Sequence, residues 1–377
     1  MSQRILFVVH HPLDRNAGVA GATVQLASAL AARGWNSRFY SFDDAFGKSG
    51  RSDVMRMLAF PFCVARHLWR NARHFDVIDA TTGDTWLWLS LGRPGGAHVR
   101  VVTHSHGLEH VAHRARLLRV ATGEVRLSWK YPLYHGGWRL REVNTTLRSA
   151  DGTVFVGATD RDWAVRELGI DAARAVAIPN ALPDGFMDIP PPAPRSPGAP
   201  LRIAVVGAWI DRKGSKVIAA AARELDARGV KVCWTLLGTH VDAATIAGEF
   251  PAGVRNALRV VPSYARTDLP RLLADSQVFL LPSWSEGFNM SLVEAMACGL
   301  APIATDVGDA RAFVRDDTGV LVGETAGASE IADAIVMLDR TPRLEALRHG
   351  AQRAVNGLRW STIADRTIAF YESIAAA

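Results

Sequence analysis

The chain alternates short apolar runs with longer segments whose apolar residues recur every three or four positions. Runs of the first kind predict buried strands, and segments of the second kind predict helices. In the first half, the predicted strands are 5–9, 38–42, 75–79, 99–103 and 152–156, and the predicted helices are 21–33 and 160–168. Short strands that alternate with helices indicate an α/β protein with a parallel, doubly wound sheet.

A proline-rich segment interrupts this alternation. Residues 189–200 (IPPPAPRSPGAP) cannot join a sheet, so we predict an extended, semi-rigid linker. The pattern then restarts, with predicted strands 201–206, 231–237, 259–261, 277–281 and 301–305 and predicted helices 215–228 and 266–274. We therefore expect Rossmann-like domains at 1–188 and 201–359, facing each other across a cleft, and a last helix within 360–377.

Length and composition agree with two domains. The chain has 377 residues, 49% of them hydrophobic, which is enough for two cores. Its three cysteines are far apart, which argues against a disulfide framework or a zinc site and fits a reducing cytoplasm. The first apolar run is too short for a signal peptide, and no run approaches the roughly 18 residues of a spanning helix. We expect a cytoplasmic protein.

The positive charge is concentrated in the first part of the chain. Residues 1–150 hold 20 Lys and Arg against 10 Asp and Glu, whereas residues 151–377 hold 23 against 27. This asymmetry suggests an anionic partner, namely a membrane, a lipid-linked phosphate or a nucleic acid; surface solubility is the simpler alternative.

Two stretches, 55–73 and 113–141, mix arginines with apolar and aromatic residues. We favour peripheral contact with an anionic membrane, on the inner face of the cell membrane. A partly buried helix pair with snorkelling arginines is the alternative. No recognised nucleic-acid motif is present, so no nucleic-acid partner is expected.

The most informative segment is 282–296, in which Glu286 and Glu294 are separated by seven residues. Glu286 follows a predicted strand, and Glu294 lies in a predicted helix that ends at Gly299. A strand, a loop and a helix start form an anion site, and a carboxylate beside it accepts hydrogen bonds from hydroxyls. This pairing suits a nucleotide sugar. The simpler interpretation is a capping box formed by Ser291 and Glu294, with Glu286 an ordinary loop carboxylate.

The sequence EGFNMSLVEAMACG resembles the donor-site signature of retaining, metal-independent glycosyltransferases of family 4, which have the GT-B fold. The resemblance implies that Glu286 contacts the transferred sugar and Glu294 the ribose, and that the last helix packs back onto the first domain. The donor-binding positions that it implies are Gly21, Gly207, Phe288, Asn289, Met290, Ser291, Leu292 and Glu294.

The segment 207–214 (GAWIDRKG) ends the first strand of the second predicted domain. Two adjacent cations there can neutralise a departing diphosphate without a metal. Family members usually have Gly-Arg-x4-Lys-Gly here; Gly207 and Lys213 match, but Ala208 replaces the arginine. Either Arg212 supplies the missing charge from another place, or the site uses Lys213 alone. A solvated loop is the structural alternative.

The first predicted domain contributes a histidine and a small-residue loop. His106, in His-Ser-His-Gly after a strand, resembles the family's cleft histidine and would face the donor sugar. We consider His104 and His110 structural rather than metal ligands. Gly18 and Gly21 match the family's loop near the acceptor and the donor phosphates, although a tight turn explains them equally well.

The segment 160–162 spells the Asp-x-Asp of metal-dependent glycosyltransferases. We favour a capping box in which Thr159 and Asp162 start a helix.

The predicted activity is retaining hexosyl transfer from a UDP- or GDP-sugar to a hydroxyl of a glycan or lipid-linked glycan. No cofactor and no metal are expected. The resemblance implies front-face attack assisted by the leaving phosphate, with domain closure excluding water. A sugar-nucleotide epimerase, which shares the GT-B fold, is disfavoured by the two glutamates. A nucleotide-sugar-binding scaffold is supported only by Ala208.

Overall fold

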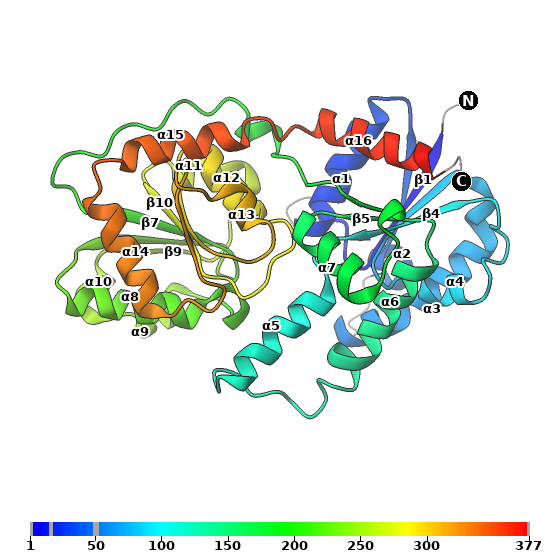
Figure 1. Ribbon diagram of the computed structural model, residues 1–377, viewed down its shortest axis with the longest axis horizontal. Helices are drawn as coiled ribbons and strands as arrows, with labels where there is room; N and C mark the ends of the chain where they lie inside the picture. Colours follow the sequence, from blue (N-terminus) through cyan, green and yellow to red (C-terminus); the bar gives the residue numbers. More distant parts are fainter. Residues whose placement is uncertain (1–2, 15–17, 48–52, 375–377) are drawn as a thin grey trace. The chain divides into compact units, whose positions relative to one another are not determined.

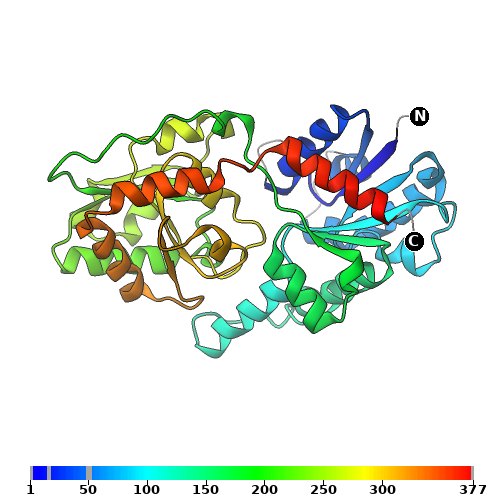
Figure 2. The same ribbon diagram turned by 45° about the horizontal axis from the view of Figure 1, so that its top comes forward.

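The computed structural model describes residues 3–14, 18–47 and 53–374, so Met1, Ser2 and residues 375–377 of the predicted last helix lie outside it. It forms two compact units, Met1–Ala181 with Arg359–Ala377, and Leu182–Leu358 (Figure 1). In each unit helices cover both faces of a parallel sheet (Figure 2). The predicted doubly wound α/β architecture is therefore confirmed.

The sheet of the first unit has the strand order β2-β1-β3-β4-β5-β6. Its strands are β1 (Arg4–Val9), β2 (Asn36–Ser41), β3 (Val77–Thr81), β4 (Arg100–Ser105), β5 (Gly152–Phe155) and β6 (Ala175–Ala177). Its helices are α1 (Gly18–Ala31), α2 (Phe42–Phe46), α3 (Asp53–Asn71), α4 (Trp86–Ser90), α5 (Glu109–Ala121), α6 (Arg139–Ser149), α7 (Ala158–Leu168) and α16 (Trp360–Ser373), with a π-helical turn at Tyr134–Trp138.

Strand β1 shows why this sheet is covered on both faces. Ile5 and Phe7 pack in one core with α1 and α16, whereas Leu6 and Val8 pack in another with α3 and α4. Successive side chains of a strand point to opposite faces, so an unbroken apolar run suits a central parallel strand.

The sheet of the second unit has the order β12-β11-β10-β7-β8-β9. Its strands are β7 (Leu201–Val206), β8 (Val232–Leu237), β9 (Leu258–Val261), β10 (Val278–Leu281), β11 (Ala301–Thr305) and β12 (Val320–Val322). Its helices are α8 (Ser215–Ala227), α9 (Ala243–Glu249), α10 (Ala252–Arg255), α11 (Leu269–Leu273), α12 (Met290–Ala297), α13 (Ala310–Phe313), α14 (Ala328–Arg340) and α15 (Leu344–Val355). Short 3-10 turns lie at Ala72–His74, Ala172–Arg174, Asp184–Phe186, Asp211–Lys213 and Arg266–Asp268.

The proline-rich segment predicted as a linker lies inside the second unit. Arg348 donates to the carbonyl of Ala193 at 2.7 Å, and Gln352 donates to the carbonyl of Ile189 at 3.0 Å. Both side chains belong to α15. Proline lacks an N–H donor but leaves carbonyl acceptors available, so an extended proline-rich segment can be held by side chains of a neighbouring helix.

The last helix, α16, packs on α1 in the first unit through Ile363, Phe370 and Tyr371. The Tyr371 hydroxyl donates to the buried carboxylate of Asp79 on β3, which also lies 3.3 Å from Nδ1 of His104. This buried contact ties the end of the chain to the middle of the first sheet.

Helix α7 begins earlier than predicted, and the predicted capping box is wrong. Gly157 is its N-cap, so Asp160 lies in the first turn, where its carboxylate accepts from the backbone N–H of Leu108 at 2.7 Å. The Asp162 carboxylate of the predicted box instead pairs with the guanidinium of Arg161 at 2.7 Å. In the described part of the chain, no helix combines the length and apolar character needed to cross a bilayer.

Tyr371→Phe is expected to lower the free energy of unfolding by about 1–3 kcal/mol, because Asp79 loses a buried hydrogen-bond donor. Urea denaturation measures the change. Tyr131→Phe is the matched control: its hydroxyl lies 3.1 Å from His113 at a partly buried position, and a loss below about 1 kcal/mol is expected. Equal losses in the two variants would contradict the assignment.

Candidate active site

The strand order of the second sheet reverses between β7 and β10. The chain runs from β7 to β8 and β9 on one side, and β10 to β12 lie on the other. In open parallel sheets, ligands bind beyond the carboxyl ends of the strands at such a switch point. Lys213 lies in the loop after β7 and Glu286 in the loop after β10, so both predicted residues meet there.

The two loops are joined by a salt bridge. Lys213 Nζ lies 2.6 Å from Glu286 Oε1, and Arg212 Nη1 lies 3.8 Å from Glu286 Oε2. Arg212 also donates to the carbonyl of Ser285 at 2.9 Å. Of the two possibilities left by Ala208, the geometry favours the first, because Arg212 and Lys213 approach the same carboxylate.

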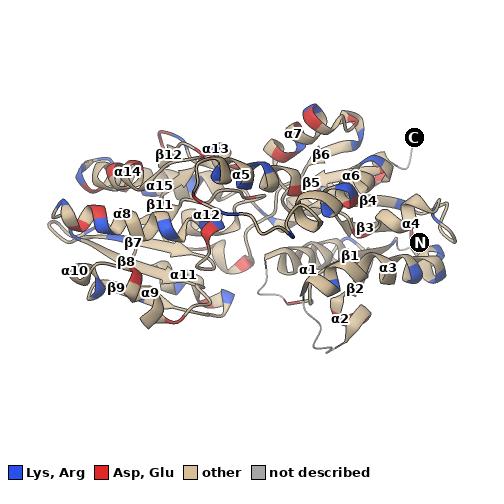
Figure 3. Ribbon diagram, turned by 90° about the horizontal axis from the view of Figure 1, so that it is seen from below, with Lys and Arg blue, Asp and Glu red and all other residues tan. Residues whose placement is uncertain are grey.

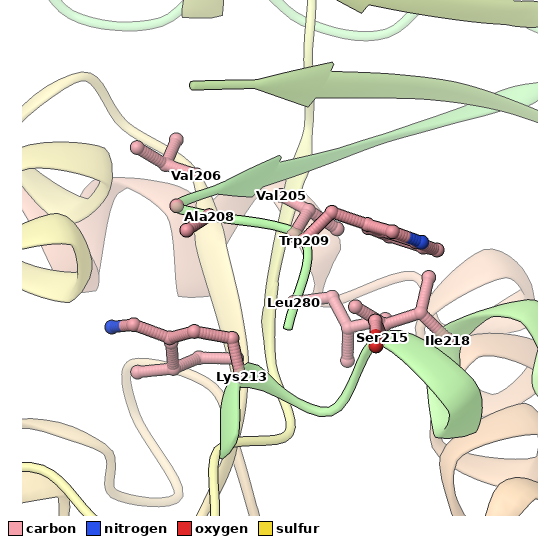
Figure 4. A pocket seen from close by; sticks show the side chains of 10 residues that line it. Val205, Val206, Ala208, Trp209, Lys213, Ser215, Ile218 and Leu280 are labelled. Atoms are coloured by element: carbon pink, nitrogen blue, oxygen red, sulfur yellow. The ribbon is translucent and has the colours of Figure 1, made fainter. Parts of the chain in front are cut away.

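A small cavity of about 10 Å³ lies under the loop that follows β7. Figure 4 shows Ala208 and the Lys213 ammonium on one side of it, with Trp209 and Ile218 on the other. Ala208 contributes only a methyl group there, and Lys213 is the cationic side chain among the described residues that line the cavity.

The electrostatic environment keeps Glu286 ionised. Burial by itself raises the pKa of this carboxyl, but the charges of Lys213 and Arg212 and the hydrogen bond from Lys213 outweigh it, so the pKa lies below its ordinary value. At neutral pH Glu286 is therefore a carboxylate, able to accept hydrogen bonds from hydroxyls.

Two glycines allow the loops to approach. Gly214 has a φ of +77°, and a Cβ there would lie 2.3 Å from the carbonyl oxygen of Pro282. Gly308, with a φ of +58°, contacts the loop after β10, where a Cβ would lie 2.5 Å from the carbonyl oxygen of Gly287. Any side chain at either position would force the loops apart.

Helix α12 starts at Met290 with Asn289 as its N-cap, so the alternative capping box of Ser291 and Glu294 is wrong. Glu294 lies beyond the first turn, where it accepts from Nε of Arg266 at 3.0 Å. Burial raises the pKa of Glu294, and Arg266 opposes that shift. A buried carboxylate with a defined partner is thus presented beside the helix start.

The backbone from Phe288 to Leu292 forms this helix start. The N–H of Met290 donates to Phe288 and that of Leu292 to Asn289, at 2.8 and 3.0 Å. The side-chain oxygen of Asn289 is buried and has no hydrogen-bond partner among the described residues. A helix start in this position has the polarity that an anionic ligand requires.

The first sheet has its own switch point, between β1 and β3. His10 follows β1 and Asp84 follows β3, and Nδ1 of His10 lies 3.0 Å from both carboxylate oxygens of Asp84. Neither residue was predicted. The available signal was the pair His10-His11 immediately after a buried strand.

His106 lies at the end of β4, close to this pair. Its ring stacks on His104 with centroids 4.5 Å apart, and the rings of His10 and His11 are 4.6 Å apart. Burial, followed by the charges of the neighbouring histidines, holds the pKa of His106 well below its usual value. Burial, His10 and Arg139 lower the pKa of His11 to about 4. His106 and His11 are therefore neutral at neutral pH.

Arg139 is a buried cation next to these histidines. It donates to the carbonyl of Thr82 at 2.7 Å and to Glu109 at 3.0 Å, and it lies 3.4 Å from Glu142 and 4.0 Å from Asp84. Three carboxylates thus surround one guanidinium. The histidines, Asp84 and Glu109 together form a polar site suited to hydroxyl groups.

The predicted loop at Gly18 and Gly21 is instead the first turn of α1, which begins at Gly18. Gly21 is buried in that turn. The small residues here continue the helix toward its start, so they do not form a separate loop in the described residues.

Two family models match the chain. Residues 17–184 match Glycosyltransferase Family 4, and residues 200–340 match Glycosyl transferases group 1. Among similar proteins is the alpha-maltose-1-phosphate synthase of Mycolicibacterium smegmatis, 28% identical over 78% of this chain and 84% of that protein. A D-inositol 3-phosphate glycosyltransferase of Mycobacterium bovis is 27% identical over 71% of this chain and 62% of its own length.

Solved structures show a similar fold. Sucrose-phosphate synthase from Thermosynechococcus elongatus has a TM-score of 0.79 at 18% identity, covering 99% of both chains. HepE from Anabaena, solved in complex with UDP, has a TM-score of 0.68 at 18% identity, covering 98% of this chain and 100% of that one.

Lys213→Met is expected to lower the free energy of unfolding by about 1–3 kcal/mol at neutral pH, because Glu286 loses its nearest cation. The lowered pKa of Glu286 contributes stability above the ordinary carboxyl range, and this contribution disappears as the pH falls through the folded-state pKa. The difference between wild type and variant should therefore persist down to the ordinary carboxyl range and shrink as the pH falls below about 4.

Urea denaturation at neutral pH and at a pH below about 4 measures this difference. Lys216→Met is the matched control, because Lys216 is exposed and its salt bridge, 3.1 Å long, is to the partly exposed Asp211. It should change the free energy of unfolding by less than about 1 kcal/mol at either pH. A Lys213→Met difference that is independent of pH would contradict the role given to Glu286.

Proposed function

The chain belongs to the family 4 glycosyltransferases and has the GT-B fold, and on that premise we propose that it transfers a hexose from a UDP- or GDP-sugar with retention and without a metal. The observation that supports this most directly is the convergence of Lys213 and Arg212 on Glu286 at the switch point of the second sheet. Two cations and a carboxylate that can accept hydrogen bonds from hydroxyls meet there, as a sugar diphosphate requires.

The two cations would stabilise the leaving group. Breakage of the sugar–phosphate bond places negative charge on the diphosphate, and preorganised ammonium and guanidinium groups stabilise that charge. In the structure Glu286 is the partner of Lys213. Bound diphosphate would compete for Lys213, leaving the Glu286 carboxylate available to accept from a hydroxyl of the transferred sugar.

The remaining residues of the second unit suit the nucleoside end. Glu294, held by Arg266, is proposed to accept from the ribose hydroxyls. The start of α12, from Phe288 to Leu292, is proposed to contact the phosphates. HepE, which shares the fold, was solved with UDP and with UDP-glucose, and this supports a UDP-sugar as the first donor to test.

The first unit suits a hydroxyl-bearing substrate. A neutral imidazole can both donate and accept, so the neutral His106 can bind a sugar hydroxyl at neutral pH. We propose a glycan or lipid-linked glycan as acceptor. The acceptor hydroxyl would attack on the face that the leaving phosphate vacates, with that phosphate taking its proton.

Donor binding is tested by thermal shift with UDP, GDP, ADP, dTDP and CMP, each with EDTA. We expect selective stabilisation by one diphosphate, retained in Lys216→Ala and lost in Lys213→Ala. The reason is that Lys213, unlike Lys216, pairs with Glu286 at the switch point. Stabilisation that requires a divalent metal would overturn metal independence, and stabilisation by none of the nucleotides would overturn the donor assignment.

Turnover is tested by release of the nucleoside diphosphate from the matching sugar nucleotide with a panel of acceptor glycans. Lys213→Ala and Glu286→Ala should each lower kcat by about 100-fold or more. NMR of the product reports the anomeric configuration. Conversion of the donor without any acceptor would indicate an epimerase instead. Full activity in both Lys213→Ala and Glu286→Ala would contradict the proposed function.

A further inference from the structure

Helix α3 has two apolar faces. Phe60, Val64 and Leu68 are buried against the first sheet. At about 100° per residue, Met55, Leu58, Phe62 and Trp69 fall within about 60° of one another on the opposite side of the helix. Trp69, Met55 and Phe62 are 63%, 58% and 57% exposed. Four large apolar side chains on one outward stripe are not explained by the core.

A second apolar group lies between α5 and α6. Trp129 and Leu133 are 75% and 65% exposed, and Trp138 is also exposed. Ring contacts join Trp138 of this group to α3: Phe62 packs against Trp86 of α4 with centroids 6.4 Å apart, and Trp86 packs against Trp138 at 5.6 Å. We call Met55, Phe62, Trp69, Trp129, Leu133 and Trp138 the docking face.

The charge around the docking face is positive. Arg66 and Arg70 are exposed on α3, and the sequence from 54 to 75 contains no Asp or Glu. Between 110 and 141 Glu124 is the sole acidic residue of the sequence, and it is bound to Arg119 at 2.9 Å. Figure 3 shows Lys and Arg along α3 and α5. Exposed aromatic residues flanked by exposed cations match the interface of an anionic bilayer.

A chain of contacts connects the docking face to the polar site of the first unit. Nε1 of Trp138 donates to Glu142 at 2.8 Å, and Glu142 pairs with Arg139. Arg139 in turn lies beside Asp84, the partner of His10. A molecule anchored in lipid next to Trp138 would therefore have its head group near the histidines.

We propose that the docking face inserts its aromatic side chains into the surface of an anionic phospholipid bilayer, and that the acceptor is carried on a lipid in that bilayer. The second part rests on the proposed function, whereas the first does not. Trp and Phe occupy the headgroup boundary, and the arginines bind lipid phosphates. The arginines on α3 and the exposed Lys130 beside Trp129 supply this charge.

Two other occupants fit these observations less well. A nucleic acid would use the arginines, but it would leave Met55, Leu133 and the other aliphatic groups without a partner. A second copy of this chain would cover the apolar residues but would place two positive surfaces against each other. Both occupants are outcomes of the test below.

The experiment is co-sedimentation of the full chain with vesicles of phosphatidylcholine alone and of phosphatidylcholine mixed equally with phosphatidylserine. We expect binding to the mixed vesicles, weakened by salt and nearly absent with phosphatidylcholine alone. Trp69→Ser with Trp129→Ser should weaken it on the order of tenfold. Arg66→Ala and Arg70→Ala should each weaken it about fivefold.

Matched controls lie on α14 of the second unit. Met337→Ser replaces an exposed apolar residue that is 47% exposed, and Arg340→Ala replaces an exposed arginine. Both should bind vesicles as the wild type does. Thermal stabilisation by UDP, measured in all variants, reports an intact fold and donor site independently of lipid.

Three results would overturn the proposal. The first is equal binding by Trp69→Ser/Trp129→Ser and wild type. The second is tight oligonucleotide binding without vesicle binding. The third is a dimer that Trp69→Ser dissociates, again without vesicle binding. If vesicle binding is confirmed but UDP stabilises no variant and no wild type, the docking face stands and the proposed transferase function fails.

Discussion

The salt bridge between Lys213 and Glu286 holds together the two loops that meet where the second sheet reverses its strand order. Glu286 is almost completely enclosed, and a buried carboxylate without a cation would cost several kcal/mol, on the order of 3–5. The approach of the loops requires Gly214, because a Cβ at this position would clash with Pro282. Backbone geometry, charge and the candidate active site therefore depend on one another.

The first unit also has a pair of residues that bridges the switch point of its sheet, but the chemistry of this pair is different. His10 and Asp84 are 74 residues apart and Lys213 and Glu286 are 73 residues apart, and each pair bridges the switch point of its own sheet. The second site presents two cations, which suit phosphates. The first presents imidazoles and carboxylates around Arg139, whose positive charge is balanced by neighbouring carboxylates. These groups suit hydroxyl groups. The strand order positions both sites, and the residues at the loop ends decide which substrate group each can bind.

Several local predictions failed for one shared reason. Ser291 and Glu294 have the spacing of a capping box, as do Thr159 and Asp162, yet neither pair forms one. Glu294 binds Arg266, and Asp162 pairs with the adjacent Arg161. In both cases the carboxylate pairs with an arginine, and a charge-assisted hydrogen bond is stronger than one from a neutral backbone N–H.

The sequence by itself determined the two series of strands and helices, the register of Gly207, Lys213, Glu286 and Glu294, and through them the family. These features are local, and periodicity or spacing encodes them. Only the tertiary structure decided that Arg212 joins Lys213, that His10 meets Asp84, and that Phe62 of α3 and Trp138 both pack against Trp86. Such contacts join residues far apart in the chain, and no local pattern specifies a distance across a folded sheet.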